Sequence, residues 1–383
     1  MPNCFCVDRK LPLAMLPDKH RTKTAKAIDA QDARARRASE SSARKVQAAV
    51  DGGYKQLRDK LGARTLAALR DARERERRAM RMLREPPSGL GLDRAKASKA
   101  CKRRVDAAAR ELGIDPSVLR AIGKATGDRI DAAMSSPAGT VMPGFHLLDN
   151  LAKWQKLSPL HKYPLDVGVR PPLDPSPNAF QVFGPDFSLW NIAFDSVESD
   201  NFRVRREYTL YEHAGAIGNI ATMDCDDADG WDLASAQIDT ELVFVYTAPR
   251  SGRLEVIIDA MNTFGHHDLT IEDEFGFSNH WTHQFNYLSL NVFHPNIAER
   301  SLALLSQFDA EGNEDRTWSV RALTPGTHYY AHLLTNGTVQ AGDTFFVGVG
   351  TRTFDKTRAD DVEVHSRSNF QWLIRSAEVR VVP

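Results

Sequence analysis

An acidic loop is the first place in this sequence where side chains could hold a metal ion. It carries four aspartates within six positions, and carboxylate oxygens are the ligands that Ca²⁺ prefers. The loop departs from the EF-hand pattern, because glycine stands at its seventh position and Ser235 stands where a bidentate glutamate belongs. An Asx-rich turn on a sandwich surface is the alternative. The candidate Ca²⁺ ligands are Asp224, Asp226, Asp227 and Asp229.

Histidines in the C-terminal half offer a second candidate metal site. His266 and Asp268 fall two apart and share a face if they lie on a strand, and His280 or His283 would complete a set of two histidines and one carboxylate. His280 and His283 are three apart, so a regular strand turns them to opposite faces. There is no HExxH spacing. Surface and cross-strand histidines are therefore the favoured interpretation, and a metal-dependent enzyme is a lesser alternative.

Nucleophile and cofactor motifs are not found. The sequence has no GxSxG, no GxxxxGK[ST] and no GxGxxG after a strand, and Cys4 and Cys6 have no CxxC partner. A non-enzymatic protein is therefore favoured, although the sequence does not decide the question. No cofactor is expected apart from the candidate Ca²⁺.

Aromatic residues alternate along 281–293, as in a strand with one buried face. Core packing is the default interpretation of this pattern. If the rings are exposed, they can stack on sugar rings, and the face then becomes a candidate ligand surface. Its members are Trp281, Phe285 and Tyr287.

Charge is segregated along the chain although its total is zero. Residues 1–135 hold 32 Lys and Arg against 17 Asp and Glu, a net charge of +15, and the remainder carries −15. Guanidinium groups pair with phosphate and carboxylate, so this region is a candidate surface for nucleic acid, an acidic partner or the acidic half of another copy. A solvated helical face is the alternative. The candidate residues are Arg70, Arg73, Arg75, Arg77, Arg78, Arg81, Arg84, Arg103 and Arg104.

Ala, Arg, Lys and Gln dominate residues 22–134, which predicts a basic helical region of about four helices after an N-terminal tail, 1–21. Gly52–Gly53 is expected to end the first helix. Asp115–Pro116 is expected to open the last one. Residues 135–186 hold nine of the 19 prolines, which predicts a connector and a domain boundary.

Short runs of β-branched and aromatic residues, separated by turn signals, fill residues 187–383. No helical pattern alternates with these runs, so we expect an acidic antiparallel β-sandwich of the jelly-roll or Greek-key type. The fold class is therefore α+β, with a helical region followed by a sandwich. The expected strands are 203–211, 241–248, 253–260, 268–275, 281–293, 317–323, 328–335, 343–351, 361–367 and 369–382.

The favoured hypothesis is a structural or assembly protein, in which the basic helices tether the sandwich to neighbouring copies, an acidic partner or nucleic acid. The alternative is a glycan- or receptor-binding sandwich on a helical stalk. A membrane-active protein with basic helices is a further lesser alternative. No apolar run is long enough to span a bilayer, and the first residues do not form a signal peptide, so we expect a cytoplasmic protein or part of a particle assembled there.

Overall fold

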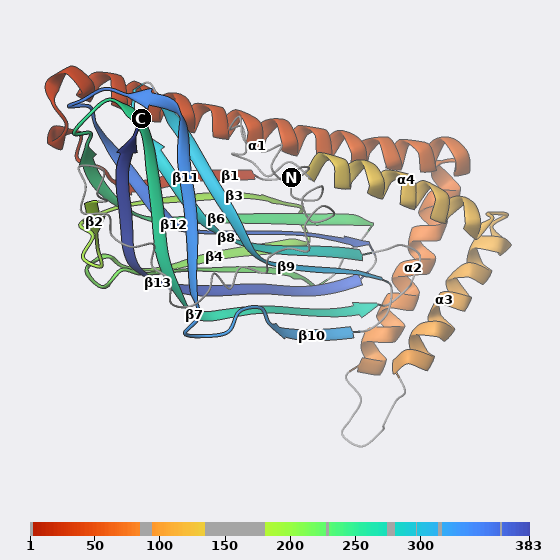
Figure 1. The fold of residues 1–383 in the computed structure, drawn as a ribbon. Helices are drawn as coiled ribbons and strands as arrows, with labels where there is room; N and C mark the ends of the chain where they lie inside the picture. The colour runs from red at the N-terminus through yellow and green to blue at the C-terminus, as the bar shows by residue number, and fades with distance from the viewer. Residues whose placement is uncertain are drawn as a thin grey trace.

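The computed structural model describes residues 3–84, 94–134, 181–226, 230–273, 280–295, 297–312, 316–360 and 362–383. Within these residues it confirms the predicted α+β fold, with N-terminal helices followed by an antiparallel β-sandwich (Figure 1). Residues 135–180 of the predicted connector lie outside the described residues. The division of the chain into four segments therefore remains a prediction.

Within the described residues, four α-helices form where helix-favouring residues dominate the sequence. The last of them begins as predicted, because the Asp115 carboxylate accepts a hydrogen bond of 2.8 Å from the backbone N–H of Ser117. None of the described helices is both long and apolar enough to cross a membrane. The helices are α1 (Asp18–Leu61), α2 (Ala63–Arg84), α3 (Arg94–Glu111) and α4 (Pro116–Met134).

The predicted helix break at Gly52–Gly53 is wrong, because α1 continues through both glycines to Leu61. The chain turns instead at Gly62, whose φ of 76° is a conformation that side chains with a Cβ disfavour. Gly53 has a packing reason to be glycine. A Cβ there would lie 2.6 Å from Thr126 and 2.8 Å from the Trp231 ring. Gly53 therefore permits α1 to pack closely on α4 and the sheet.

Two antiparallel sheets form the sandwich. The first has six strands in the order β1-β3-β6-β12-β8-β9, and the second follows the order β10-β7-β13-β5-β4, with β11 beside β7 and β2 beside β13. The strands are β1 (Asn3–Lys10), β2 (Gln181–Phe183), β3 (Leu189–Glu198), β4 (Phe202–Tyr211), β5 (Ala216–Cys225), β6 (Trp231–Thr247), β7 (Gly252–Asp273), β8 (His280–Phe293), β9 (Ala298–Gly312), β10 (Arg316–Arg321), β11 (His328–Val339), β12 (Thr344–Asp360) and β13 (Val362–Val382). Short 3-10 helices form at Leu13–Met15 and Glu212–Ala214.

Several strands are longer than the sequence predicts. The expected strands 253–260 and 268–275 both fall on the single strand β7, which ends at Asp273, and 361–367 and 369–382 both fall on β13, which begins at Val362. Residues 274, 275 and 361 lie outside the described residues. The N-terminal segment differs as well. The sequence predicts a tail there, but β1 pairs along its whole length with β3 and so forms an edge of the six-stranded sheet.

Helix α1 covers part of the outer face of the six-stranded sheet. Helix α1 runs along this face, and α4 packs beside α1. Helices α2 and α3 extend away from the sheets as a hairpin (Figure 1). Near the start of α1, Leu16 and Ile28 pack on Phe293 and neighbouring sheet residues. Further along, Val46 and Val50 join an apolar cluster with sheet and α4 residues. The helix is thus anchored at two apolar contacts with a polar stretch between them.

Candidate functional site: a polar cavity beneath helix α1

A cavity of about 60 Å³ lies between the middle of α1 and the outer face of the six-stranded sheet. On the scale where a single water needs about 10–15 Å³, it has room for about four waters. Its rim on α1 stays partly open, because Gln31 and Asp32 are half-buried and Arg34 is exposed. The lining residues are Phe5, Val7, Arg9, Gln31, Asp32, Arg34, Ala35, Asn191, Ala193, Phe194, Gln237, Asp239, Asn291, Phe293, Arg300 and Arg352.

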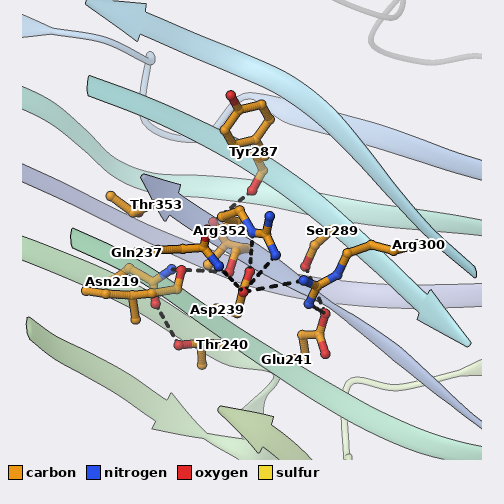
Figure 2. Close-up of polar contacts among 12 residues, drawn as sticks. Asn219, Gln237, Asp239, Thr240, Glu241, Tyr287, Ser289, Arg300, Arg352 and Thr353 are labelled. Carbon is orange, nitrogen blue, oxygen red and sulfur yellow. Dashed lines mark hydrogen bonds and ion pairs between the residues drawn. The ribbon is translucent and has the colours of Figure 1, made fainter. Parts of the chain in front are cut away.

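Asp239 is at the centre of a network of ion pairs and hydrogen bonds in the floor of the cavity. Figure 2 shows the contacts of this network. Arg352 binds its two carboxylate oxygens through Nε and Nη2, at 2.6 and 2.9 Å. Arg300 lies 3.4 Å from Asp239 Oδ2 and donates a 2.8 Å hydrogen bond to Glu241. Burial opposes ionisation of Asp239, but the two arginines outweigh it and hold its pKa below the usual value. The network therefore stays ionised.

Glu241 is the second buried carboxylate of this floor. Its oxygens accept hydrogen bonds from Asn191 at 2.7 Å and from Ser289 at 3.3 Å, besides the bond from Arg300. The neighbouring strand leaves room for it through Gly348, where a Cβ would come within 3.1 Å of Glu241 Oε2. Since hydrogen bonds fix this side chain on several sides, the floor of the cavity is preorganised.

Five lining residues carry a buried polar atom without a hydrogen-bond partner in the described part of the chain. Two of these atoms are donors and three are acceptors. The amide orientation is fixed for Asn191 and Gln237, because their NH₂ groups donate to Glu241 and Asp239 and leave the carbonyl oxygens free. The five atoms are Arg9 Nη1, Arg300 Nε, Asn191 Oδ1, Gln237 Oε1 and Asn291 Oδ1.

The buried charges around the cavity are paired. Arg9, Arg300 and Arg352 bind the carboxylates Asp32, Asp239 and Glu241, so this set has no net charge. The fourth lining arginine, Arg34, is exposed at the rim, where water and salt screen its charge. The interior of the cavity therefore has little excess charge with which to attract a free ion. It offers unsatisfied donors and acceptors to a neutral group instead.

A further carboxylate lies close to this network under α1. Asp195 accepts a 2.7 Å hydrogen bond from Ser39 of α1. Burial raises its pKa to about 6, although Ser39 and Arg352 act in the opposite direction. This contact ties the middle of the helix to the sheet.

The structure describes two of the four predicted metal ligands of the acidic loop. Asp224 lies 3.3 Å from His365, and the exposed Asp226 lies 3.7 Å from Arg203. Asp227 and Asp229 lie outside the described residues. The Ca²⁺ site thus remains a prediction.

The predicted histidine set is also dispersed. His266 is 3.3 Å from Asp268, as the shared strand face predicts, but His283 pairs with Asp309 on β9 instead. His280 is buried on the opposite face of β8 from His283. At the N-terminus, the sulfur atoms of Cys4 and Cys6 lie 3.1 Å apart on β1.

The aromatic residues of β8 are largely packed. Trp281 and Tyr287 are 3% and 4% exposed, and Phe285 is half-buried. Trp281 joins the apolar cluster of α1 and α4, and Tyr287 packs with Phe354. In this structure the rings contribute to packing rather than to an open ligand face.

The predicted basic residues are on the projecting hairpin of α2 and α3. Arg70, Arg75, Arg103 and Arg104 are exposed, and the Arg70 guanidinium lies 5.1 Å from the centre of the Tyr54 ring. The other members lie on α2, but their side chains are outside the described part. These are Arg73, Arg77, Arg78, Arg81 and Arg84.

Sequence reasoning did not find the cavity residues. From Gln237 to Leu242, amide and acidic residues alternate with Ile238, Thr240 and Leu242, which is close to the ordinary pattern of a strand with one face in solvent. The same pattern also fits a polar face covered by a helix. Nothing local in the sequence separates the two.

The fold is thus a β-sandwich with one face covered by a helix. No protein-family model matches the chain, and no curated protein does. Among solved structures, it is similar to a family 35 carbohydrate binding module from Clostridium thermocellum, with 9% identity over 49% of this chain and 92% of that one, and a TM-score of 0.16. A second, TmCBM61 in complex with β-1,4-galactotriose, is 12% identical over 47% of this chain and 89% of that one, with a TM-score of 0.12. Likenesses this slight carry no argument about function.

Proposed function

We propose that this protein is a binding module for a small, neutral, hydroxyl-rich ligand, a saccharide or polyol, and that the ligand's hydroxyl-bearing end occupies the cavity beneath α1. The observation that carries the proposal is the set of five buried, unpartnered polar atoms lining one cavity in the described part of the chain. Leaving such atoms unpaired costs about 1–3 kcal/mol each, so a partner that satisfies them gains affinity.

Hydroxyl groups match this set best, because each hydroxyl both donates and accepts hydrogen bonds. A carboxylate or phosphate would satisfy the free arginine donors but not the three free amide oxygens. A cation would satisfy the free amide oxygens but not the free arginine donors. The apolar side of a sugar can pack on Phe5 and Phe293, which also line the cavity.

The arrangement favours binding over covalent chemistry. Both carboxylates of the floor are tied to guanidinium groups, so neither is free to act as a nucleophile. The volume admits one end of a sugar rather than a whole oligosaccharide. Specificity would then come from the hydroxyl pattern of that end.

The test is ligand binding by saturation-transfer NMR and calorimetry. The panel contains glucose, galactose, mannose, xylose and glycerol, with sulfate and acetate as charged comparators. We expect at least one neutral member to bind the folded protein and the anions not to bind.

The key variant is Asn291→Leu, which removes one free acceptor at nearly constant volume and should weaken binding about tenfold. Asn369→Leu, on the other sheet, is the matched control and should leave affinity unchanged. The proposal is contradicted if no member of the panel binds the folded protein, or if Asn291→Leu binds as tightly as the natural chain. Either result would show that the cavity holds only water.

A second function is favoured by a separate observation, the basic hairpin of α2 and α3 that extends away from the sandwich (Figure 1). Its exposed arginines are placed to contact an anionic partner, nucleic acid or the acidic surface of another copy. Such contacts would make the protein part of an assembly. The two functions are compatible, because they use different surfaces.

Light scattering after size-exclusion chromatography, at low and high salt and with and without nuclease, tests this second function. We expect a larger species at low salt that Arg75→Glu with Arg103→Glu disperses. Arg321→Glu on β10 is the control, because that arginine is exposed far from the hairpin in sequence. A monomer at every salt concentration contradicts the assembly, and excess absorbance at 260 nm that nuclease removes identifies nucleic acid.

A further inference from the structure

Three metal-ligating side chains from distant parts of the chain meet where α1 begins. His20 lies in the first turn of α1, His294 directly follows β8, and Asp343 directly precedes β12. Their ligand atoms all lie within 4.8 Å of one another. We propose that these three residues form a binding site for a divalent transition-metal ion, in the first place Zn²⁺. The inference is independent of the cavity and of the proposed function.

The spacing of the atoms is that of metal ligands rather than of hydrogen-bonded groups. Asp343 Oδ1 is 3.5 Å from His20 Nε2, and Asp343 Oδ2 is 3.7 Å from His294 Nε2. Hydrogen bonds between such groups are about 2.7–3.2 Å long. Ligands of a tetrahedral Zn²⁺ with bonds of about 2.1 Å are separated by about 3.4 Å. The two Asp343 distances are thus close to the separation of metal ligands, and the ligand atoms of His20 and His294 lie within 4.8 Å of each other.

The chemistry of the set fits the ion. Two imidazole nitrogens and one carboxylate are a ligand set that proteins use for Zn²⁺ and for Fe²⁺, whereas Ca²⁺ and Mg²⁺ prefer oxygen ligands alone. His20 Nε2 is buried and has no hydrogen-bond partner in the described part of the chain. A metal ion would satisfy this atom. Three protein ligands leave a fourth position for water or another ligand.

The surroundings hold two of the three ligands, Asp343 and His294, in place. The Asp343 carboxylate accepts a 2.9 Å hydrogen bond from the backbone N–H of Gln340. The backbone of His294 exchanges hydrogen bonds with that of Ile297 at 3.1 and 3.3 Å. The His294 ring packs edge-on against Phe345, with ring centres 5.7 Å apart. Preorganised ligands of this kind are what a metal site requires.

The site would fasten the start of α1 to the sandwich. The side chains of His20, His294 and Asp343 are only 12%, 1% and 10% exposed, so the ion would be enclosed at the helix–sandwich junction. Because metal binds the folded arrangement and not the unfolded chain, it adds to the stability of the fold. We therefore infer a structural role for the ion.

The experiment uses the untagged full chain after chelator treatment. Calorimetric titration with Zn²⁺ should give one site per chain, and Zn²⁺ should raise the melting temperature. Co²⁺ should bind at the same site and show the visible absorption of a tetrahedral ion. His20→Gln and Asp343→Asn should each weaken Zn²⁺ binding at least about tenfold, with unchanged circular dichroism. His20→Gln should also abolish the rise in melting temperature.

Two controls make the assignment specific. His332→Ala removes a half-exposed histidine that pairs with Glu255 on the other sheet, and it should leave the affinity unchanged. The double variant Cys4→Ser with Cys6→Ser removes the competing thiol pair and should also bind Zn²⁺ normally. The proposal is overturned if no stoichiometric site is found, if the cysteine variant loses it, or if His20→Gln and Asp343→Asn bind as tightly as the natural chain.

Discussion

Arg352 binds Asp239 side-on through two hydrogen bonds of 2.6 and 2.9 Å, although the two side chains are only 2% and 1% exposed. They belong to the adjacent strands β12 and β6 and are direct neighbours in the strand register. Two buried charges of this kind are costly to separate, because either one alone lacks both water and a partner. The floor of the cavity therefore depends on both residues.

Removal of either partner should destabilise the fold strongly. We expect Arg352→Met and Asp239→Asn each to lower the free energy of unfolding by about 3–5 kcal/mol, since each leaves uncompensated charge in the interior. The double variant should lose clearly less than the sum of the two. Urea unfolding of the four proteins measures the coupling. Simple additivity would show that the pair does not act as a unit.

Asp195 should make stability fall as the pH rises. Its folded pKa of about 6 lies above the value of 3.8 for a free aspartate, because the carboxyl group is buried. The unfolded chain therefore loses this proton at lower pH, and the native state is destabilised between about pH 4 and 6, by up to about 3 kcal/mol. Asp195→Asn, which can still accept from Ser39, should be more stable than the natural chain at pH 7.5 and lose that advantage at pH 4.

The control for this effect is Asp226→Asn, at a carboxylate that is 60% exposed. This variant removes one carboxylate charge from the surface. Its stability relative to the natural chain should therefore be nearly the same at pH 7.5 and at pH 4. Denaturant unfolding at both pH values gives the comparison. An Asp195→Asn curve parallel to that of the natural chain across this range would contradict the raised pKa.

The sequence was sufficient to predict the class of fold, because strand and helix periodicities are local. β4, for example, spans Phe202–Tyr211, and the sequence predicts a strand at 203–211. It was not sufficient for the length of α1, because the glycines at 52 and 53 are normally helix breakers. The close approach of Trp231 and Thr126, which is a tertiary contact, explains the glycine at 53.

The site could not be predicted for a related reason. Asp239 meets Arg300 and Arg352, which lie 61 and 113 positions away along the chain. Their meeting depends on the strand order and register, and short motifs carry neither. The metal cluster of His20, His294 and Asp343 is likewise assembled only when α1 docks on the sandwich. Sequence reasoning instead selects histidines close in sequence, such as His280 and His283, which lie on opposite faces of β8.

His267 should have the opposite pH dependence to Asp195, because it lowers the stability of the fold as the pH falls. Its ring is buried between the sheets, with Nε2 at 2.8 Å from the Ser306 hydroxyl and Nδ1 at 3.2 Å from that of Ser368. Burial, with a smaller contribution from His266, lowers its pKa to about 4. The unfolded chain takes up this proton near pH 6.5, so up to about 3 kcal/mol is lost as the pH falls to about 4.

NMR of the imidazole signals measures this pKa directly, and His267 should remain neutral at pH 5. His267→Gln cannot be protonated, so its stability relative to the natural chain should improve as the pH falls from 7 to 4.5. A ring that titrates near pH 6.5 would show that the site is open to water.

Two glycines in the helices should respond in opposite ways to the same substitution. Gly53→Ala places a methyl group against Thr126 and the Trp231 ring, at 2.6 and 2.8 Å from the Cβ, so α1 must move away from α4 and the sheet. We expect a loss of about 1–3 kcal/mol in the free energy of unfolding. Gly123→Ala on α4 meets no atom within 4 Å and should gain about 0.5–1 kcal/mol from helix propensity. Thermal and urea unfolding of both variants separate the two effects. If Gly53→Ala and Gly123→Ala stabilise the fold equally, α1 does not pack closely on α4 and Trp231. The glycine at position 53 would then have no packing explanation.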